Sequence, residues 1–205
     1  MSRIRVVLLD IGGVLVTEGP MTWAEEWGVD AATLESVLGE LDPDDALTVG
    51  LRDEGWLRDA LMSRLGVEEA DADRLMGAMW DWYCGSPDEA MLAWVRSLAG
   101  RVRVAGLSNS ADGARREEQR RYGLPSLLDP LLYSHEIGMR KPDAAIYQVA
   151  CATLGVEPNA IVFVDDRPEN VQAAREAGMH AVLHATSIVT IAAVEALLVA
   201  PTLAP

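Results

Sequence analysis

Four short polar groups in the sequence carry side chains that together suit the binding of an anionic substrate and a cation. They are Asp10, Ser108-Asn109, Lys141 and Asp165-Asp166. Carboxylates bind divalent cations, whereas an ammonium, a hydroxyl and an amide donate hydrogen bonds to anionic oxygens. Each group taken singly has an ordinary explanation as a cap, a turn or a solvated charge. Their placement relative to the predicted strands is what favours a common site.

Three of these groups follow short apolar runs that are typical of buried strands. The runs cover residues 5–9, 102–107 and 161–164 and end at Asp10, Ser108 and Asp165. Runs of β-branched residues and leucine that stop at polar turn residues predict strands of a sheet.

Helical patterns lie between and after the predicted strands. They cover residues 87–98 with Ser86 as the expected cap, 112–122, 143–154 closed by Gly155, and 168–177 closed by Gly178. Alternating strands and helices of this length predict an α/β fold with a Rossmann-like parallel sheet core. Such sheets bind ligands at the carboxyl ends of their strands, so we expect the polar groups to share one edge.

Residues 16–83 interrupt this alternation. We find no convincing strand in them, and helical patterns cover residues 31–41, 53–65 and 68–83. Five of the six tryptophans lie in this stretch: Trp23, Trp27, Trp56, Trp80 and Trp82. We therefore predict an all-helical domain at 16–83, inserted into a core made of residues 1–15 and 84–205.

The apolar stripes of the insertion have more than one interpretation. Trp23 with Trp27, and Met76 with Trp80 and Tyr83, recur at helical spacing. We interpret them as the core of the insertion and its contact with the sheet. Substrate contact and a homodimer formed through the insertion remain alternatives.

The composition indicates a folded protein and excludes some classes of partner. The chain has 205 residues, of which 50% are hydrophobic and 24% charged, as in soluble globular domains. Lys and Arg number 17 against 32 Asp and Glu, a net charge of −15. This charge repels nucleic acid and anionic membrane surfaces. A small anionic substrate can still bind where a metal ion reverses the sign locally.

The sequence also predicts a cytoplasmic location. Cys84 and Cys151 form no disulfide framework, which is typical of a reducing compartment. The N-terminal apolar run stops at Asp10, too early for a secretory signal. The apolar stretch 188–200 is too short to span a bilayer and contains Glu195.

Four segments resemble the haloacid dehalogenase superfamily of aspartate-nucleophile hydrolases. They are VVLLDIGGVLV from Val6, AGLSNS from Ala105, SHEIGMRKPDAAIY from Ser134 and IVFVDDRPENVQAAREAGM from Ile161. Within that superfamily, the sequence is most similar to glucose-1-phosphate-type phosphatases and to the N-terminal phosphatase domain of soluble epoxide hydrolases. The insertion resembles the helical C1 cap of the superfamily.

The resemblance implies a phosphatase in which Asp10 is the nucleophile and forms an aspartyl phosphate that water hydrolyses. It implies Mg²⁺ as cofactor, held by Asp10, Asp166 and the backbone carbonyl of Gly12. Charge supports this: three carboxylates and a phosphate carry about −5 together, and a dication with Lys141 offsets it. Asp165 is expected to orient Lys141, and the substrate is expected to be a small phosphate ester.

The remaining expected contacts concern the phosphate. Lys141, the Ser108 hydroxyl and the Asn109 amide are expected to bind the phosphoryl oxygens. The backbone N–H groups of the turn at residues 12–14, including Gly13, are expected to add an anion nest.

One departure from the superfamily concerns Gly12. Phosphatases of this group usually carry a second aspartate there, which protonates the leaving oxygen, and its loss typically lowers the rate by about 10²- to 10⁴-fold. The glucose-1-phosphate type can also carry glycine at this position. A water or Glu18 is an alternative proton source.

Other titratable residues are interpreted as structural. His135 is expected in a loop, and His180 and His184 at a late strand. Arg167 is expected to form a surface ion pair, with a phosphate contact as the alternative.

Two further functions stay open at this point. One is a metal-free haloacid dehalogenase in which Asp10 attacks carbon, although the Asp165-Asp166 pair and the glycine in place of a tyrosine at position 12 argue against it. The other is a catalytically weak protein that binds a phosphorylated metabolite or a partner.

Overall fold

A five-stranded parallel sheet forms the core of the computed structural model, which describes residues 3–199. Its strands are β1 (Val6–Leu9), β4 (Arg103–Ser108), β5 (Leu131–Tyr133), β6 (Ile161–Asp165) and β7 (His180–Leu183). They lie in the order β5-β4-β1-β6-β7, and all neighbours pair in parallel. The predicted α/β fold with a Rossmann-like sheet is confirmed. The sequence analysis did not identify β5, which has only three residues.

Strand β1 is central because its side chains are apolar on both faces. Val6 and Leu8 pack against one hydrophobic cluster, and Val7 and Leu9 against the other, as the alternation of side chains along a strand requires. All four are at most 1% exposed. A strand buried on both faces belongs in the middle of a parallel sheet.

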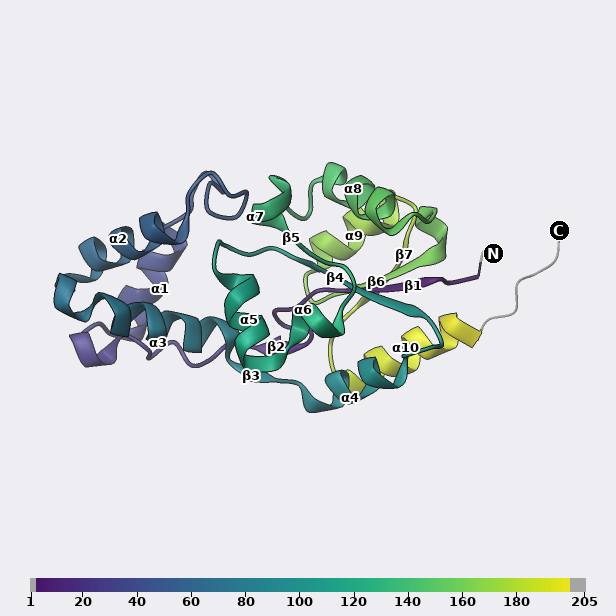
Figure 1. The fold of residues 1–205 in the computed structure, drawn as a ribbon, viewed down its shortest axis with the longest axis horizontal. Helices are drawn as coiled ribbons and strands as arrows, with labels where there is room; N and C mark the ends of the chain where they lie inside the picture. The colour runs from purple at the N-terminus through teal and green to yellow at the C-terminus, as the bar shows by residue number, and fades with distance from the viewer. Residues whose placement is uncertain (1–2, 200–205) are drawn as a thin grey trace.

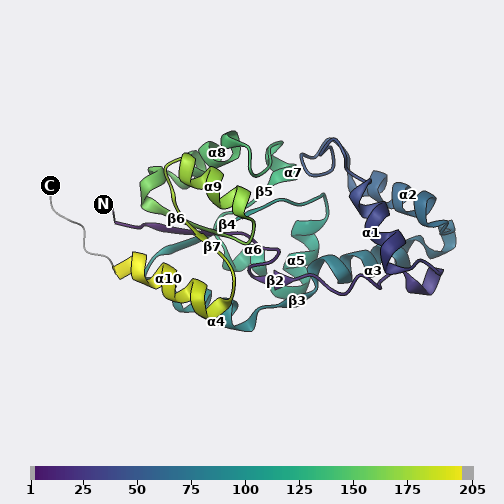
Figure 2. The same ribbon diagram turned by 180° about the vertical axis from the view of Figure 1, so that it is seen from behind.

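Helices cover both faces of the sheet (Figures 1 and 2). One face is covered by α8 (Ala144–Leu154) and α9 (Pro168–Glu176). The other is covered by α4 (Glu89–Ser97), α5 (Ala114–Tyr122), α6 (Leu124–Leu127) and α10 (Ser187–Val199). Gly155 ends α8 in the left-handed conformation, as predicted.

The start of α4 differs from the prediction. Ser86 does not cap this helix, because Ser86–Pro87 form the short strand β3. The cap is Asp88, whose side chain accepts a 2.8 Å hydrogen bond from the Met91 N–H. Either residue type can cap a helix, so the sequence pattern alone did not separate them.

The segment between β1 and β3 is mostly helical. It contains α1 (Ala31–Gly39), α2 (Glu54–Leu65) and α3 (Ala72–Cys84), with 3₁₀ turns at Glu25–Trp27 and Glu69–Asp71. Asp30 and Asp53 cap α1 and α2 through their side chains. These helices lie at the end of the molecule farthest from both termini (Figure 1).

The expectation that residues 16–83 contain no strand is wrong at one point. Val16–Thr17 form β2, which pairs antiparallel with β3 where the chain enters and leaves the helical segment. A two-residue strand is too short to show a recognisable alternation of side chains.

The tryptophan-rich helices pack as a common core. Met76 and Trp80 are buried, and Trp23 stacks on Trp82 with ring centroids 6.2 Å apart. Tyr83, from the same predicted stripe, instead faces a cavity at the sheet edge. Of this stripe, Tyr83 lines the cavity and Met76 and Trp80 do not.

The predicted C-terminal helix is present as α10, and residues from Ala200 onward lie outside the described part of the chain. Within residues 3–199, no helix has the length and apolar character needed to cross a membrane. Cys84 and Cys151 are free thiols.

Candidate active site

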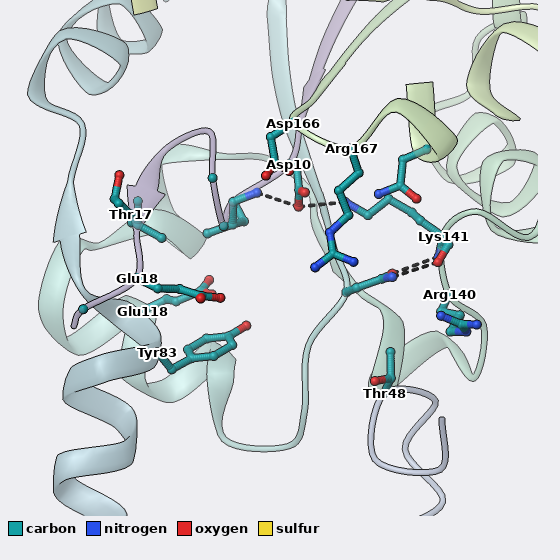
Figure 3. Close-up of a pocket in the computed structure, with 17 residues that line it drawn as sticks. Asp10, Thr17, Glu18, Thr48, Tyr83, Glu118, Arg140, Lys141, Asp166 and Arg167 are labelled. Atoms are coloured by element: carbon teal, nitrogen blue, oxygen red, sulfur yellow. Dashed lines mark hydrogen bonds and ion pairs between the residues drawn. The ribbon is translucent and has the colours of Figure 1, made fainter. Parts of the chain in front are cut away.

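A cavity of about 640 Å³ opens at the carboxyl ends of β1 and β6 (Figure 3). Asp10 directly follows β1, Ser108 ends β4 and Asp165 ends β6. Residues from the helical segment, including Thr17, Glu18, Thr48 and Tyr83, line the opposite side. The parallel sheet thus brings together side chains that are far apart in sequence.

Lys141 lies between two carboxylates. Its Nζ is 2.7 Å from Asp10 Oδ1 and 2.8 Å from Asp165 Oδ2, and the lysine is only 1% exposed. It is also the only lysine in the sequence. A compact ammonium with three donors suits such a narrow gap between carboxylates.

The loop that carries Lys141 is fixed to the end of β4 by Asn109. The Asn109 Oδ1 accepts the Lys141 backbone N–H, and the Asn109 Nδ2 donates to the Lys141 carbonyl, both at 2.8 Å. Asn109 therefore positions Lys141, a role that the sequence analysis did not foresee. One amide hydrogen remains, so its expected contact with phosphate stays a prediction.

Asp165 is fully buried, and its carboxylate oxygens are occupied. Oδ1 accepts the Arg167 N–H, Oδ2 accepts Lys141 Nζ, and Asn170 Nδ2 lies within 3.1 Å of both oxygens. This arrangement suits the expected task of orienting Lys141. It also leaves Asp165 poorly placed to bind a metal ion.

The remaining oxygens fit a hard divalent cation. Carboxylate oxygens of Asp10, Asp165 and Asp166 lie within 4.8 Å of one another. With Asp165 engaged, Asp10 and Asp166 are available, and no hydrogen-bond donor among residues 3–199 contacts the Gly12 carbonyl. Two carboxylates, a carbonyl and water are oxygen donors of the kind that Mg²⁺ prefers.

Gly13 has a different task from the expected one. Its N–H donates to the Val16 carbonyl at 2.8 Å, and the Val14 N–H donates to Ile11 at 3.2 Å. The expected anion nest is wrong for these two groups, because the tight turn uses their N–H groups internally. Gly13 has φ of 72°, and a side chain there would overlap Asp166. Glycine thus gives the Asp166 carboxylate room.

The charge of Asp10 is costly without a further cation. Burial raises the pKa of Asp10 to about 7, although Lys141 opposes this effect. The Ile11 N–H also donates to Oδ1 at 2.7 Å and favours the ionised form. A cation bound beside Asp166 would hold Asp10 ionised at neutral pH, as a nucleophile requires.

Arg167 lines the cavity, whereas the three histidines do not. His135 belongs to the short helix α7 (Ser134–Ile137) and not to a loop, and its Nδ1 is 3.0 Å from Ser110 Oγ. His180 and His184 lie on and after β7 and do not line the cavity. Arg167 lines the cavity and forms no ion pair within the described chain, so the expected surface pair is absent there.

Sequence reasoning missed several cavity residues, among them Thr48, Glu118 and Arg140, and named Tyr83 only as part of an apolar stripe. They come from helices and loops and not from strand ends. Glu118 follows Glu117 in an arginine-rich helix, where the pattern offers no sign that one of the two faces inward.

A sequence model of a known family matches most of the chain. The family is described as haloacid dehalogenase-like hydrolase, and the match covers residues 4–178.

Three relatives share sequence similarity with the chain. Drimenol cyclase drtB of Aspergillus calidoustus is 28% identical over 88% of this chain and 34% of its own length. (S)-2-haloacid dehalogenase 4A of Burkholderia cepacia is 34% identical over 68% of this chain and 55% of its own. Sesquiterpene phosphatase astK of Aspergillus oryzae is 25% identical over 87% of this chain and 88% of its own length. The chain thus matches about a third of the length of the drimenol cyclase and about half of the length of the dehalogenase.

The fold is also that of a solved structure. A HAD family enzyme from Bacteroides thetaiotaomicron, in complex with magnesium and inorganic phosphate, superposes with a TM-score of 0.76 at 20% identity. The alignment covers 88% of this chain and 93% of the other.

Proposed function

Because the chain belongs to the haloacid dehalogenase-like hydrolase family, we propose that it is a Mg²⁺-dependent phosphatase of small phosphorylated metabolites. The observation that carries this proposal is the pair of carboxylates, Asp10 and Asp166, left available beside the Lys141–Asp165 ion pair. The match to a sesquiterpene phosphatase over 88% of its length gives further support.

We assign the roles by the position of each group. The phosphate binds against Lys141 and the free N–H of Asn109, which line the cavity. The hydroxyl of Ser108, which is buried at the end of β4, is the third expected donor. An oxygen of Asp10 attacks phosphorus, and the bond between phosphorus and the ester oxygen breaks. Water then attacks the aspartyl phosphate and restores the Asp10 carboxylate. Asp165 keeps Lys141 in place throughout.

The metal has a limited and definite part in this proposal. Mg²⁺ would be held by Asp10, Asp166 and the Gly12 carbonyl, and would neutralise the charge that repels phosphate from Asp10. The protein's own contribution is to hold these oxygens on one side of the cavity, with Lys141 on the other side of Asp10.

We further propose that residues 16–83 are a cap over a core of residues 1–15 and 84–205. Thr17, Glu18, Thr48 and Tyr83 line the cavity from that segment. They face the place where the leaving group of a phosphate ester would lie, so the cap would select the substrate.

Phosphate release over a panel of sugar phosphates, nucleotides and acyl phosphates tests the proposal. We expect release with Mg²⁺ and a loss of about 10²-fold in EDTA, because several kcal/mol of charge stabilisation are removed. Added Mg²⁺ should restore the rate.

The dehalogenase remains the second candidate, because one relative at 34% identity is a haloacid dehalogenase. The same preparation should therefore be assayed for halide release from 2-haloacids in EDTA. Metal-independent halide release without phosphate release would replace the phosphatase by this alternative.

A further inference from the structure

The cavity contains a buried carboxyl group that the proposed mechanism has not used. An ester with an alkoxide leaving group needs a proton at the bridging oxygen, and the next step needs an acceptor for a proton of water. Asp10 is assigned to the attack on phosphorus, Lys141 and Asp165 are paired with each other, and Asp166 is assigned to the cation. Gly12 offers no side chain, and nothing lies within 4 Å of where its Cβ would be.

We infer that Glu118 is the general acid and base of this site, donating a proton to the leaving oxygen and then accepting one from the attacking water. The inference rests on the proposed phosphatase function. Glu118 lies on α5, which follows the Ser108-Asn109 turn, and its side chain points into the cavity together with Glu18 and Tyr83 (Figure 3).

The hydrogen bonding of Glu118 leaves one oxygen available. The residue is 1% exposed, and Oε2 accepts a 2.6 Å hydrogen bond from the Tyr133 hydroxyl. Oε1 is buried and has no hydrogen-bond partner within the described chain. Buried polar atoms are nearly always paired, so an unpaired carboxyl oxygen on a residue that lines the cavity indicates a group held ready for a ligand.

A purely structural role does not explain this residue. Its neighbour Glu117, also buried, pairs with Arg116, Arg120 and Arg121. Glu118 forms no ion pair with any described residue. Glu117 thus stabilises the helix surface, whereas Glu118 is held by Tyr133 alone.

The charges around Glu118 suit a group that must both give and take a proton. Burial raises the pKa of Glu118 to about 7. The hydrogen bond from Tyr133 and the charge of Arg115 oppose this rise, and the charge of Asp10 adds to it. Tyr83, which interacts with Glu118, has a pKa well above its ordinary value because of burial, so it stays protonated. A carboxyl group with a pKa near neutral can serve in both directions.

Glu118 gives up one proton in the first step and regains one in the second. Asp10 attacks phosphorus, the ester P–O bond breaks, and the leaving oxygen takes the Glu118 proton to become an alcohol. Glu118 is then a carboxylate and removes one proton from water, whose oxygen attacks phosphorus. The P–O bond to Asp10 breaks, giving inorganic phosphate, free Asp10 and protonated Glu118.

Glu18 is the other carboxyl group in the cavity and the one that the sequence analysis considered. It is exposed and has Arg167 and Asp166 as charged neighbours. Burial raises the pKa of Glu18 too, with Arg167 opposing the rise and Asp166 adding to it. Its exposure to solvent, unlike the enclosed position of Glu118, makes Glu18 the weaker candidate. The two carboxyl groups can be separated by matched glutamine variants.

The test compares E118Q with wild type on an alkyl phosphate from the panel and on p-nitrophenyl phosphate, whose leaving group needs little protonation. On the alkyl ester we expect a loss of about 10²- to 10⁴-fold. On p-nitrophenyl phosphate we expect a burst of one nitrophenol per enzyme and then slow turnover, because water lacks a proton acceptor. E117Q is the matched control and should behave as wild type on both, since Glu117 lies outside the cavity.

Each result has a definite meaning. An unchanged E118Q, or equal losses on both esters without a burst, would overturn the role of Glu118 while leaving the phosphatase intact. The burst appearing in E18Q and not in E118Q would transfer the role to Glu18. Circular dichroism and an E118D variant, which keeps a carboxyl group and should recover part of the alkyl activity, exclude misfolding. Absence of phosphate release by wild type from every ester would overturn both proposals.

Discussion

Asp10→Asn is expected to lower turnover by about 10⁴- to 10⁶-fold, because it removes the proposed nucleophile and leaves the rest of the site in place. Asparagine has nearly the same shape, and its amide can still contact Lys141. Binding of inorganic phosphate should therefore survive better than turnover. The measurement is phosphate release together with phosphate binding by calorimetry, both in Mg²⁺.

The same variant is expected to be more stable than wild type in EDTA. Burial raises the pKa of Asp10 to about 7, so the folded state binds its proton more tightly than the unfolded state does. Ionised Asp10 then lowers the free energy of unfolding above that pKa, and asparagine removes this cost. The stability gain should be full at about pH 8 and should disappear as the pH falls toward the unfolded value near 4.

Thermal unfolding at pH 8 and pH 5 checks this sign. A variant that melts at the same temperature as wild type at pH 8 as well as at pH 5 would contradict the charge account. Turnover retained by the variant would remove Asp10 as the nucleophile. A gain in stability with a loss of turnover is the pattern expected of a group that is held for chemistry.

Lys141→Met is expected to destabilise the fold by about 3–5 kcal/mol at neutral pH, since it leaves Asp10 and Asp165 facing each other without a cation. Both carboxylates contact Nζ within 2.8 Å. Methionine has a similar length, so the loss reports charge and not volume. Phosphate binding should weaken as well, because the only cation that contacts Asp10 in the described chain is removed.

Two further variants make this measurement decisive. Lys141→Arg keeps the charge, but its wide guanidinium does not fit the gap between the two carboxylates, so we expect it to lose activity as well. In the double variant Asp10→Asn with Lys141→Met, stability should recover in part, because one of the two repelling charges is gone. Urea unfolding that gives no loss for Lys141→Met would show that the ion pair contributes little.

The sequence was sufficient to place the acidic groups but not the groups that hold them. Asp10, Ser108 and Asp165 were predictable because they end parallel strands, whose carboxyl ends meet at one edge. Lys141 comes from a loop, and its position depends on the two hydrogen bonds to Asn109, a contact across 32 positions of sequence. No local pattern contains such a contact.

The position of Glu118 in the cavity could not be predicted from the sequence either. Adjacent residues of an α-helix point about 100° apart, so Glu117 and Glu118 face different surroundings although their types are identical. Among the arginines of α5, both are typical of a solvated helix surface. Both carboxyl groups are buried, and only the packing of α5 against Tyr133 and the cavity distinguishes Glu118 from Glu117, which pairs with arginines.

The central claim is that Asp10 carries the phosphoryl group, and the most direct measurement is to find it there. The protein would be mixed with p-nitrophenyl phosphate and Mg²⁺, quenched in acid during turnover, digested and examined by mass spectrometry. We predict a phosphoryl group on the peptide that contains Asp10, absent in EDTA and in Asp10→Asn. Turnover without any phosphopeptide, or a phosphoryl group on another residue, would contradict the account.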